Sequence, residues 1–99
     1  MATVIVQGVF VVDPADRDRF IEGSIEGIRS SRAEEGCQEY VFGADPVDPG
    51  RVVLSERWES MELLQQHLKG LGSGSTENRP APKSVEITMY EVASTKKMV

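Results

Sequence analysis

Residues 3–12, TVIVQGVFVV, are the segment that most restricts the fold of this 99-residue chain, because they are apolar on both alternating faces. Successive side chains of a β-strand point to opposite sides of its sheet, and both sides here carry β-branched or aromatic residues. Such a strand must be covered from both sides. We therefore predict that helices cover one sheet face and that a partner, most simply a second copy of the chain, covers the other.

The rest of the chain predicts two helices and three further strands. The first helix begins with Asp13 as N-cap and Pro14 in the first turn, and its apolar spacing continues to about Ala33. Ser60 is the predicted N-cap of the second helix. In chain order the predicted segments are strand 3–12, helix 13–33, strand 37–44, turn 45–50, strand 51–58, helix 60–71, loop 71–83 and strand 84–93.

This order, strand–helix–strand–strand–helix–strand, predicts an α+β ferredoxin-like βαββαβ sandwich. A four-stranded antiparallel sheet would carry both helices on one face. We predict one domain over residues 1–95 and a frayed tail at 96–99.

Composition excludes several classes of function. A net charge of −5 without a basic patch argues against binding to nucleic acid or to an anionic membrane. Cys37 is the sole cysteine, so it forms no internal disulfide, and the chain has too few Cys and His for a structural zinc site. The apolar N-terminal segment lacks a basic region and predicts a strand rather than a signal peptide, so we expect a cytoplasmic protein.

Residues 34–70, EEGCQEYVFGADPVDPGRVVLSERWESMELLQQHLKG, carry a resemblance to a known family. A Gly-Cys-x-x-Tyr strand, an Asp-Pro turn, a Glu-Arg-Trp strand end and a helical His follow one another as in the antibiotic biosynthesis monooxygenase domain. Residues 89–92, MYEV, resemble the closing strand of that domain. The resemblance implies a ferredoxin-like domain that pairs sheet to sheet as a dimeric α+β barrel. It also implies cofactor-independent monooxygenation of quinols and anthrones or, in one branch, haem degradation.

The haem-degrading branch fits this chain poorly. Members of that branch carry an Asn where this chain has Gln7 and a Trp at the helical position held by His67. Their axial His would fall near Glu77, and His67 is the only histidine in the chain. Without an imidazole at that position iron has no evident protein ligand, so haem degradation is disfavoured. Many relatives also place a short aromatic-containing helix where the polar 71–83 loop stands, which affects the shape of any pocket.

His67 is the candidate catalytic residue. It flanks the predicted apolar stripe of the second helix, formed by Met61, Leu64, Leu68 and Leu71, and can face the space between helix and sheet. The resemblance places this histidine at a pocket, where it would act as a general base. The alternative is a structural or surface histidine. Because the leucines can hold the helix without it, we expect the imidazole to contribute little stability.

Four further residues are candidates for substrate binding, and each has a structural alternative. Trp58, the sole tryptophan, shares a strand face with Val52 and Leu54, which suits a core or interface anchor as well as a substrate platform. Tyr40 and Tyr90 could donate phenolic hydrogen bonds or be ordinary buried tyrosines. Gln7 interrupts an apolar strand, and its amide needs partners, whether backbone or ligand.

Other features have plainer interpretations. Glu56 and Arg57 are predicted to serve a strand or dimer salt bridge. The GLGSGS segment follows a helix rather than a strand, so it predicts a flexible loop and not a phosphate-binding loop.

Two functions follow from these observations. The first is a cofactor-independent monooxygenase that deprotonates a small electron-rich aromatic, a quinol or anthrone, so that the anion transfers an electron to dioxygen. His67 would be the base, no metal or organic cofactor would be bound, and dioxygen would be the co-substrate. The second is a non-catalytic dimeric module of the same fold that binds a small molecule or regulates a partner.

Overall fold

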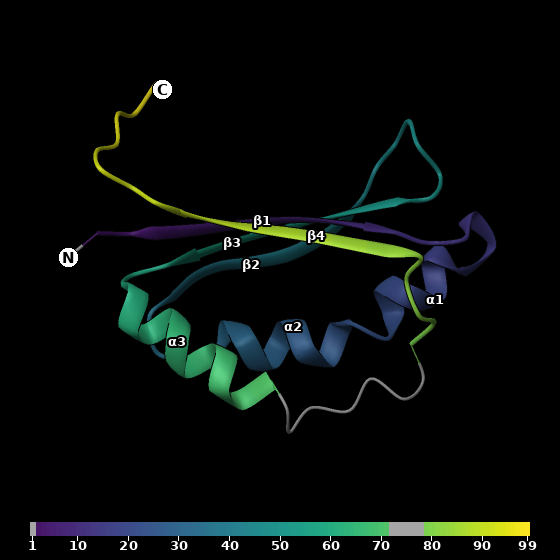
Figure 1. The fold of residues 1–99 in the computed structure, drawn as a ribbon, viewed down its shortest axis with the longest axis horizontal. Helices are drawn as coiled ribbons and strands as arrows, with labels where there is room; N and C mark the ends of the chain where they lie inside the picture. Colours follow the sequence, from purple (N-terminus) through teal and green to yellow (C-terminus); the bar gives the residue numbers. More distant parts are fainter. Residues whose placement is uncertain (1, 72–78) are drawn as a thin grey trace.

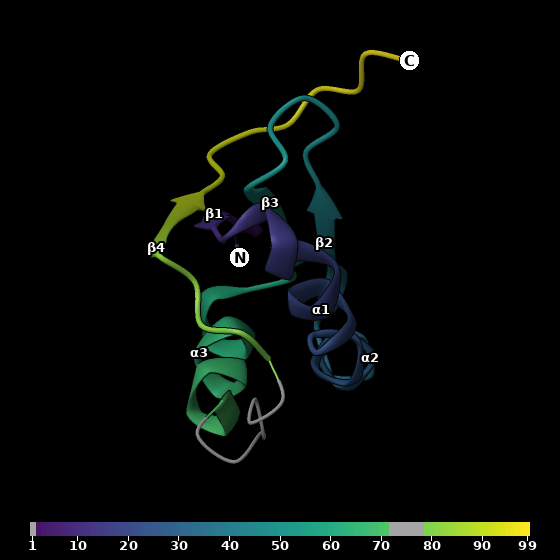
Figure 2. The same ribbon diagram turned by 90° about the vertical axis from the view of Figure 1, so that its right-hand side faces the viewer.

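The computed structural model of the chain describes residues 2–71 and 79–99. Four antiparallel strands form one sheet in the order β2-β3-β1-β4, and the helices lie on one of its faces (Figures 1 and 2). The elements are β1 (Val4–Val11), the 3-10 turn η1 (Pro14–Asp16), α1 (Arg17–Glu22), α2 (Ile25–Arg32), β2 (Cys37–Ala44), β3 (Arg51–Trp58), α3 (Met61–Gly70) and β4 (Ser84–Glu91). The predicted α+β ferredoxin-like fold is confirmed, with strand ends shifted by one or two residues.

The first predicted helix is wrong as a single element, because the segment breaks into η1, α1 and α2. Asp13 caps it as expected, its side chain accepting from the Ala15 N–H. The break between α1 and α2 falls at Gly23 and Ser24, where the Ser24 hydroxyl donates to the Phe20 carbonyl. A Cβ on Gly23 would stand only 3.2 Å from the Cα of Arg79, so packing against a distant segment favours glycine here.

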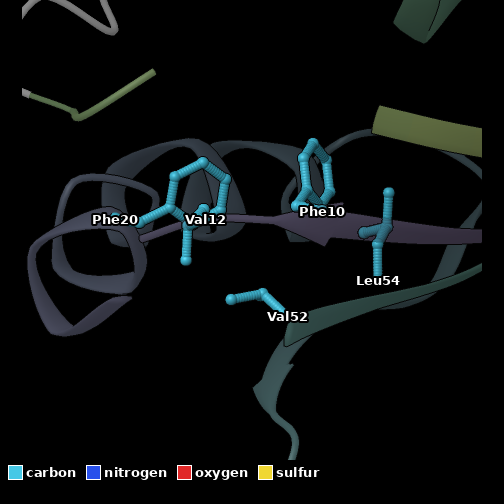
Figure 3. Packing of buried hydrophobic residues seen from close by; sticks show 5 residues of the cluster. All are labelled: Phe10, Val12, Phe20, Val52 and Leu54. Carbon is cyan, nitrogen blue, oxygen red and sulfur yellow. The ribbon is translucent and has the colours of Figure 1, made fainter. Parts of the chain in front are cut away.

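The core lies between the sheet and the helices in two clusters. One cluster brings together aromatic and aliphatic residues of β1, the residue after it, α1 and β3, as Figure 3 shows: Phe10, Val12, Phe20, Val52 and Leu54. The other lies between α3 and the sheet and contains Val4, Val6, Trp58 and Leu64. Trp58 is fully buried, so its predicted role as a core anchor is confirmed.

The sheet face turned away from the helices mixes apolar and polar side chains. Residues directly opposite each other on antiparallel strands share a face, so the strand register assigns each residue to a side. Val4 and Val6 are buried on the helix side, which places the alternate residues of β1 and their partners on the other side. These include Ile5, Gln7, Val9, Val11, Val53, Arg57, Thr88 and Tyr90.

Helix α3 buries a different stripe from the predicted one. Ser60 caps it as expected, accepting from the Leu63 N–H, and Leu64 is buried. Leu68 and Leu71, however, are 52% and 54% exposed, whereas His67 is only 5% exposed. α3 diverges from the sheet along its length (Figure 1). Its buried residues, Leu64 and His67, lie within its first two turns.

Candidate functional site

His67 lies in the interior on the sheet-facing side of α3. Its ring centroid is 4.6 Å from that of Trp58, with the ring planes tilted by 33°. The ring of Tyr40 meets it edge-on, with the centroids 5.6 Å apart. Both aromatic residues come from neighbouring strands, β2 and β3, and face the helices. The imidazole therefore packs in the interface between α3 and the sheet.

A carboxylate holds this imidazole in place. Glu34, in the turn between α2 and β2, places Oε2 2.6 Å from Nδ1 of His67. The Glu34 side chain remains 36% exposed while that of His67 is 3% exposed. With an ionised carboxylate as acceptor, Nδ1 carries the proton, and Nε2 of the neutral ring is left with the basic lone pair. This arrangement is the one that a general base requires.

Glu56 is a second carboxyl group in the same interior. It is 5% exposed and accepts the indole N–H of Trp58, with 2.8 Å between Nε1 and Oε1. Burial raises the pKa of Glu56, while the Trp58 hydrogen bond and nearby His67 act in the opposite direction. The predicted salt bridge is therefore wrong for Glu56, because alternation along β3 turns it inward. Arg57 points to the other face, where its Nε donates to Gln38.

Tyr40 and Arg79 extend this polar interior toward α1 and α2. Burial, reinforced by the Glu56 charge, raises the pKa of Tyr40 to about 12, so its phenol is a hydrogen-bonding group and not an acid near neutral pH. Arg79 places its guanidinium 4.6 Å from the centre of the Phe20 ring and donates to the Ser24 hydroxyl. Burial lowers the pKa of Arg79, and interaction with Tyr40 partly offsets this effect.

The structure brings together three of the five predicted site residues. Tyr40, Trp58 and His67 meet on the helix-facing side of the sheet, whereas Gln7 and Tyr90 lie on the opposite face. Gln7 is exposed and pairs with Ser55 and Thr88, and Tyr90 is 49% exposed opposite Ile5. A strand alternates its faces, so neither side chain can join the His67 site within one chain. Their substrate-binding role stays a prediction that requires a partner on that face.

Three residues of the interior were missed as site residues by sequence reasoning. Glu56 carried a usable signal, since it shares one face of β3 with Val52, Leu54 and Trp58. Glu34 and Arg79 carried none, because each reaches the site from a connection between elements.

Two depressions open near the site. One of about 220 Å³ is lined by Glu34, Glu35, Leu63, Gln66 and His67. The other, of about 380 Å³, lies at the β2 edge and is lined by Arg32, Cys37, Gln38, Glu39 and Tyr40. Typical small-molecule pockets hold about 300–1,000 Å³. The depression beside His67 is smaller than that range, so it suits only a small ligand.

Two further findings apply to residues 2–71 and 79–99. Within these ranges no group of three or more His, Cys, Asp or Glu side chains could hold a metal ion. No helix in the described part is long and apolar enough to cross a membrane. Glu77, which bears on the haem argument, and most of the GLGSGS segment lie outside the described residues.

Comparison with known proteins identifies the family. The model of the antibiotic biosynthesis monooxygenase family matches residues 3–72. The chain belongs to this family. An uncharacterised protein from Synechocystis is 30% identical over 95 residues, which are 93% of this chain. The chain spans 65% of the length of that curated relative.

Several solved structures share this fold. A mutant form of SnoaB, a cofactor-independent oxygenase from Streptomyces nogalater, has a TM-score of 0.76 at 15% identity, covering 96% of this chain and 97% of its own. A protein from Mycobacterium tuberculosis is 25% identical with a TM-score of 0.69, covering 99% and 100% of the two chains. A conserved protein from Methanosarcina mazei is 24% identical with a TM-score of 0.74, covering 92% and 93%. Such likenesses establish the fold of this family member.

Proposed function

We propose that this family member is a cofactor-independent monooxygenase that oxidises a small electron-rich aromatic, with His67 as general base. The observation that carries the proposal is the buried imidazole of His67, held at Nδ1 by Glu34 and packed against Trp58 and Tyr40. A base with a fixed tautomer in a water-poor aromatic surrounding suits removal of a phenolic or benzylic proton.

The chemistry requires no external reductant. A hydroquinone and one dioxygen give a hydroxyquinone and one water, and an anthrone methylene and one dioxygen give a carbonyl and one water. In both reactions the substrate supplies all four electrons that dioxygen accepts. The chain has only to take a proton at Nε2 of His67 and to stabilise the resulting anion until it transfers an electron to dioxygen.

The features around His67 favour a quinol of one or two rings. The depression of about 220 Å³ is small, and Glu34, Glu35 and Gln66 offer polar partners for hydroxyl groups. Trp58 cannot offer its N–H to this substrate, because that donor is occupied by Glu56. Trp58 is fully buried and does not line this depression, so its role is to support the imidazole ring from the interior.

The proposal includes a homodimer formed through the sheet face away from the helices. Ile5, Val9, Val11 and Val53 gather there, which favours burial against a like surface. Light scattering at micromolar concentration should give the mass of a dimer. A stable monomer would contradict the barrel arrangement and leave Gln7 and Tyr90 without a route to any site.

Oxygen consumption tests the reaction. Purified protein should take up dioxygen with a panel of quinols or anthrones, and the rate should fall as the imidazole becomes protonated. His67→Gln, which keeps much of the side-chain volume, should reduce the rate by about a hundredfold or more, the usual share of a general base. Gln65→Ala, an exposed change on the same helix, is the matched control and should keep the wild-type rate.

The alternative outcomes separate the remaining functions. Equal rates and pH profiles in wild type and His67→Gln would rule out the imidazole as the base. Absence of uptake across the panel, together with saturable binding of the same aromatics, would favour the non-catalytic binding module.

A further inference from the structure

Glu56 is the most unusual charged group of the described interior. Carboxyl groups are rarely buried without a cationic partner, yet Glu56 is 5% exposed and its side chain hydrogen-bonds to the Trp58 indole. Sheet pairing sets it directly opposite Tyr40 on the helix-facing side. It therefore lies among the three aromatic rings of the site rather than in a surface ion pair.

The contacts link Glu56 to His67 through Trp58. The indole donates to Glu56 at 2.8 Å, and its ring lies 4.6 Å from the imidazole, centroid to centroid. A hydrogen bond at Nε1 limits rotation of the indole, so Glu56 sets the surface against which the imidazole packs. The carboxyl group is also close enough to interact electrostatically with His67.

We propose that Glu56 is a positioning residue that orients Trp58 and thereby acts on His67, so that two carboxyl groups influence the imidazole, Glu34 by direct contact and Glu56 through the Trp58 ring that it holds. The proposal rests on the proposed function for its catalytic meaning, since a base held in one orientation meets its substrate in the geometry that proton transfer requires. Its physical content, coupling between Glu56 and His67, holds independently of any substrate.

Other groups also face His67 and have to be separated from Glu56. Glu34 and Glu35 approach from the turn after α2, Tyr40 from β2, and Trp58 from β3. Burial raises the pKa of Glu56, and nearby His67 acts in the opposite direction. The two groups should therefore respond to each other's protonation.

The chain offers clean probes, since it has one histidine and one tryptophan. NMR titration of the His67 ring protons, without substrate, should show two inflections in the wild-type protein. Glu56→Gln keeps an acceptor for the indole N–H but removes the charge, so the titration should become simpler and its curve should move relative to wild type. Glu62→Gln removes an exposed carboxylate from the helix that carries His67 and should leave the wild-type curve unchanged.

Tryptophan fluorescence gives a second readout. Protonated imidazole quenches a neighbouring indole, so Trp58 emission should follow the His67 titration and shift with it in Glu56→Gln. If a substrate is active, the pH profile of its turnover should shift the same way. If these spectroscopic shifts are seen but no substrate is turned over, the proposed function is contradicted and the coupling stands.

An unchanged His67 titration in Glu56→Gln would overturn the proposal. If that variant does not fold, Glu34→Gln replaces it, because Glu34 is partly exposed and lies outside the core. A second inflection that persists in Glu34→Gln supports coupling to Glu56. A single-step curve there contradicts it.

Discussion

The Glu56–Trp58 hydrogen bond makes a quantitative prediction about stability. Trp58→Phe keeps an aromatic ring but leaves the buried Glu56 carboxyl without its donor. Glu56→Leu leaves the indole N–H buried without an acceptor. Each single change should lower the free energy of unfolding by about 1–3 kcal/mol, because a buried polar group left unpaired bears its full desolvation cost.

The double variant removes both polar groups and should lose less than the sum of the single variants. Residues in one buried hydrogen bond typically show an interaction energy of about 0.5–3 kcal/mol, and we expect about 1–2 kcal/mol here. The exposed Glu26–Arg29 pair on α2 provides the control, with 3.0 Å between Nη1 and Oε1 and side chains 86% and 72% exposed. Its coupling should stay below about 0.5 kcal/mol.

Urea unfolding followed by far-UV circular dichroism measures all four variants of each cycle, since Trp58→Phe removes the fluorophore. Additive losses at Glu56 and Trp58, within the error shown by the control pair, would refute the argument that these two groups satisfy each other in a dry interior.

Further predictions concern two glycines, His67 and the pH dependence of Glu56→Gln. Gly36→Ala should destabilise the protein by more than about 1 kcal/mol in urea unfolding, because Gly36 has φ of 83° and a Cβ there would meet Leu63. Gly27→Ala, in α2 with nothing within 4 Å of the new Cβ, should instead stabilise by about 0.5–1 kcal/mol, and equal losses at both glycines would contradict this. His67→Ala should cost about 1–3 kcal/mol in the same assay, more than the sequence led us to expect, because the ring is buried; a loss below about 0.5 kcal/mol would show that its packing is unimportant. Burial raises the pKa of Glu56, so the folded protein holds the Glu56 proton more tightly than the unfolded chain does, and wild type loses folding stability as pH rises above the ordinary glutamate value of 4.5. Glu56→Gln should therefore gain stability relative to wild type from that pH toward neutral pH. A pH-independent difference would contradict this.

The sequence by itself determined the order of the elements and the inward face of β3. Strand periodicity, the capping residues Asp13 and Ser60, and the Asp–Pro turn depend on residues close together in the chain. Local chemistry is sufficient to specify such features. For the same reason Trp58 could be predicted as a buried anchor, because it shares a strand face with Val52 and Leu54.

The tertiary structure decided which polar groups meet. Arg79 packs so closely on Gly23 that a Cβ there would be crowded, and His67 is buried because α3 packs against the sheet side of the core at Leu64 and His67. Glu34 reaches His67 across 33 residues of sequence, and Arg79 reaches Ser24 across 55. Strand alternation turns Gln7 to the sheet face away from His67, so its substrate-binding role stays a prediction that depends on a partner on that face. A site assembled from separate connections leaves no periodic signal in the sequence, since its geometry arises only when the helices pack on the sheet.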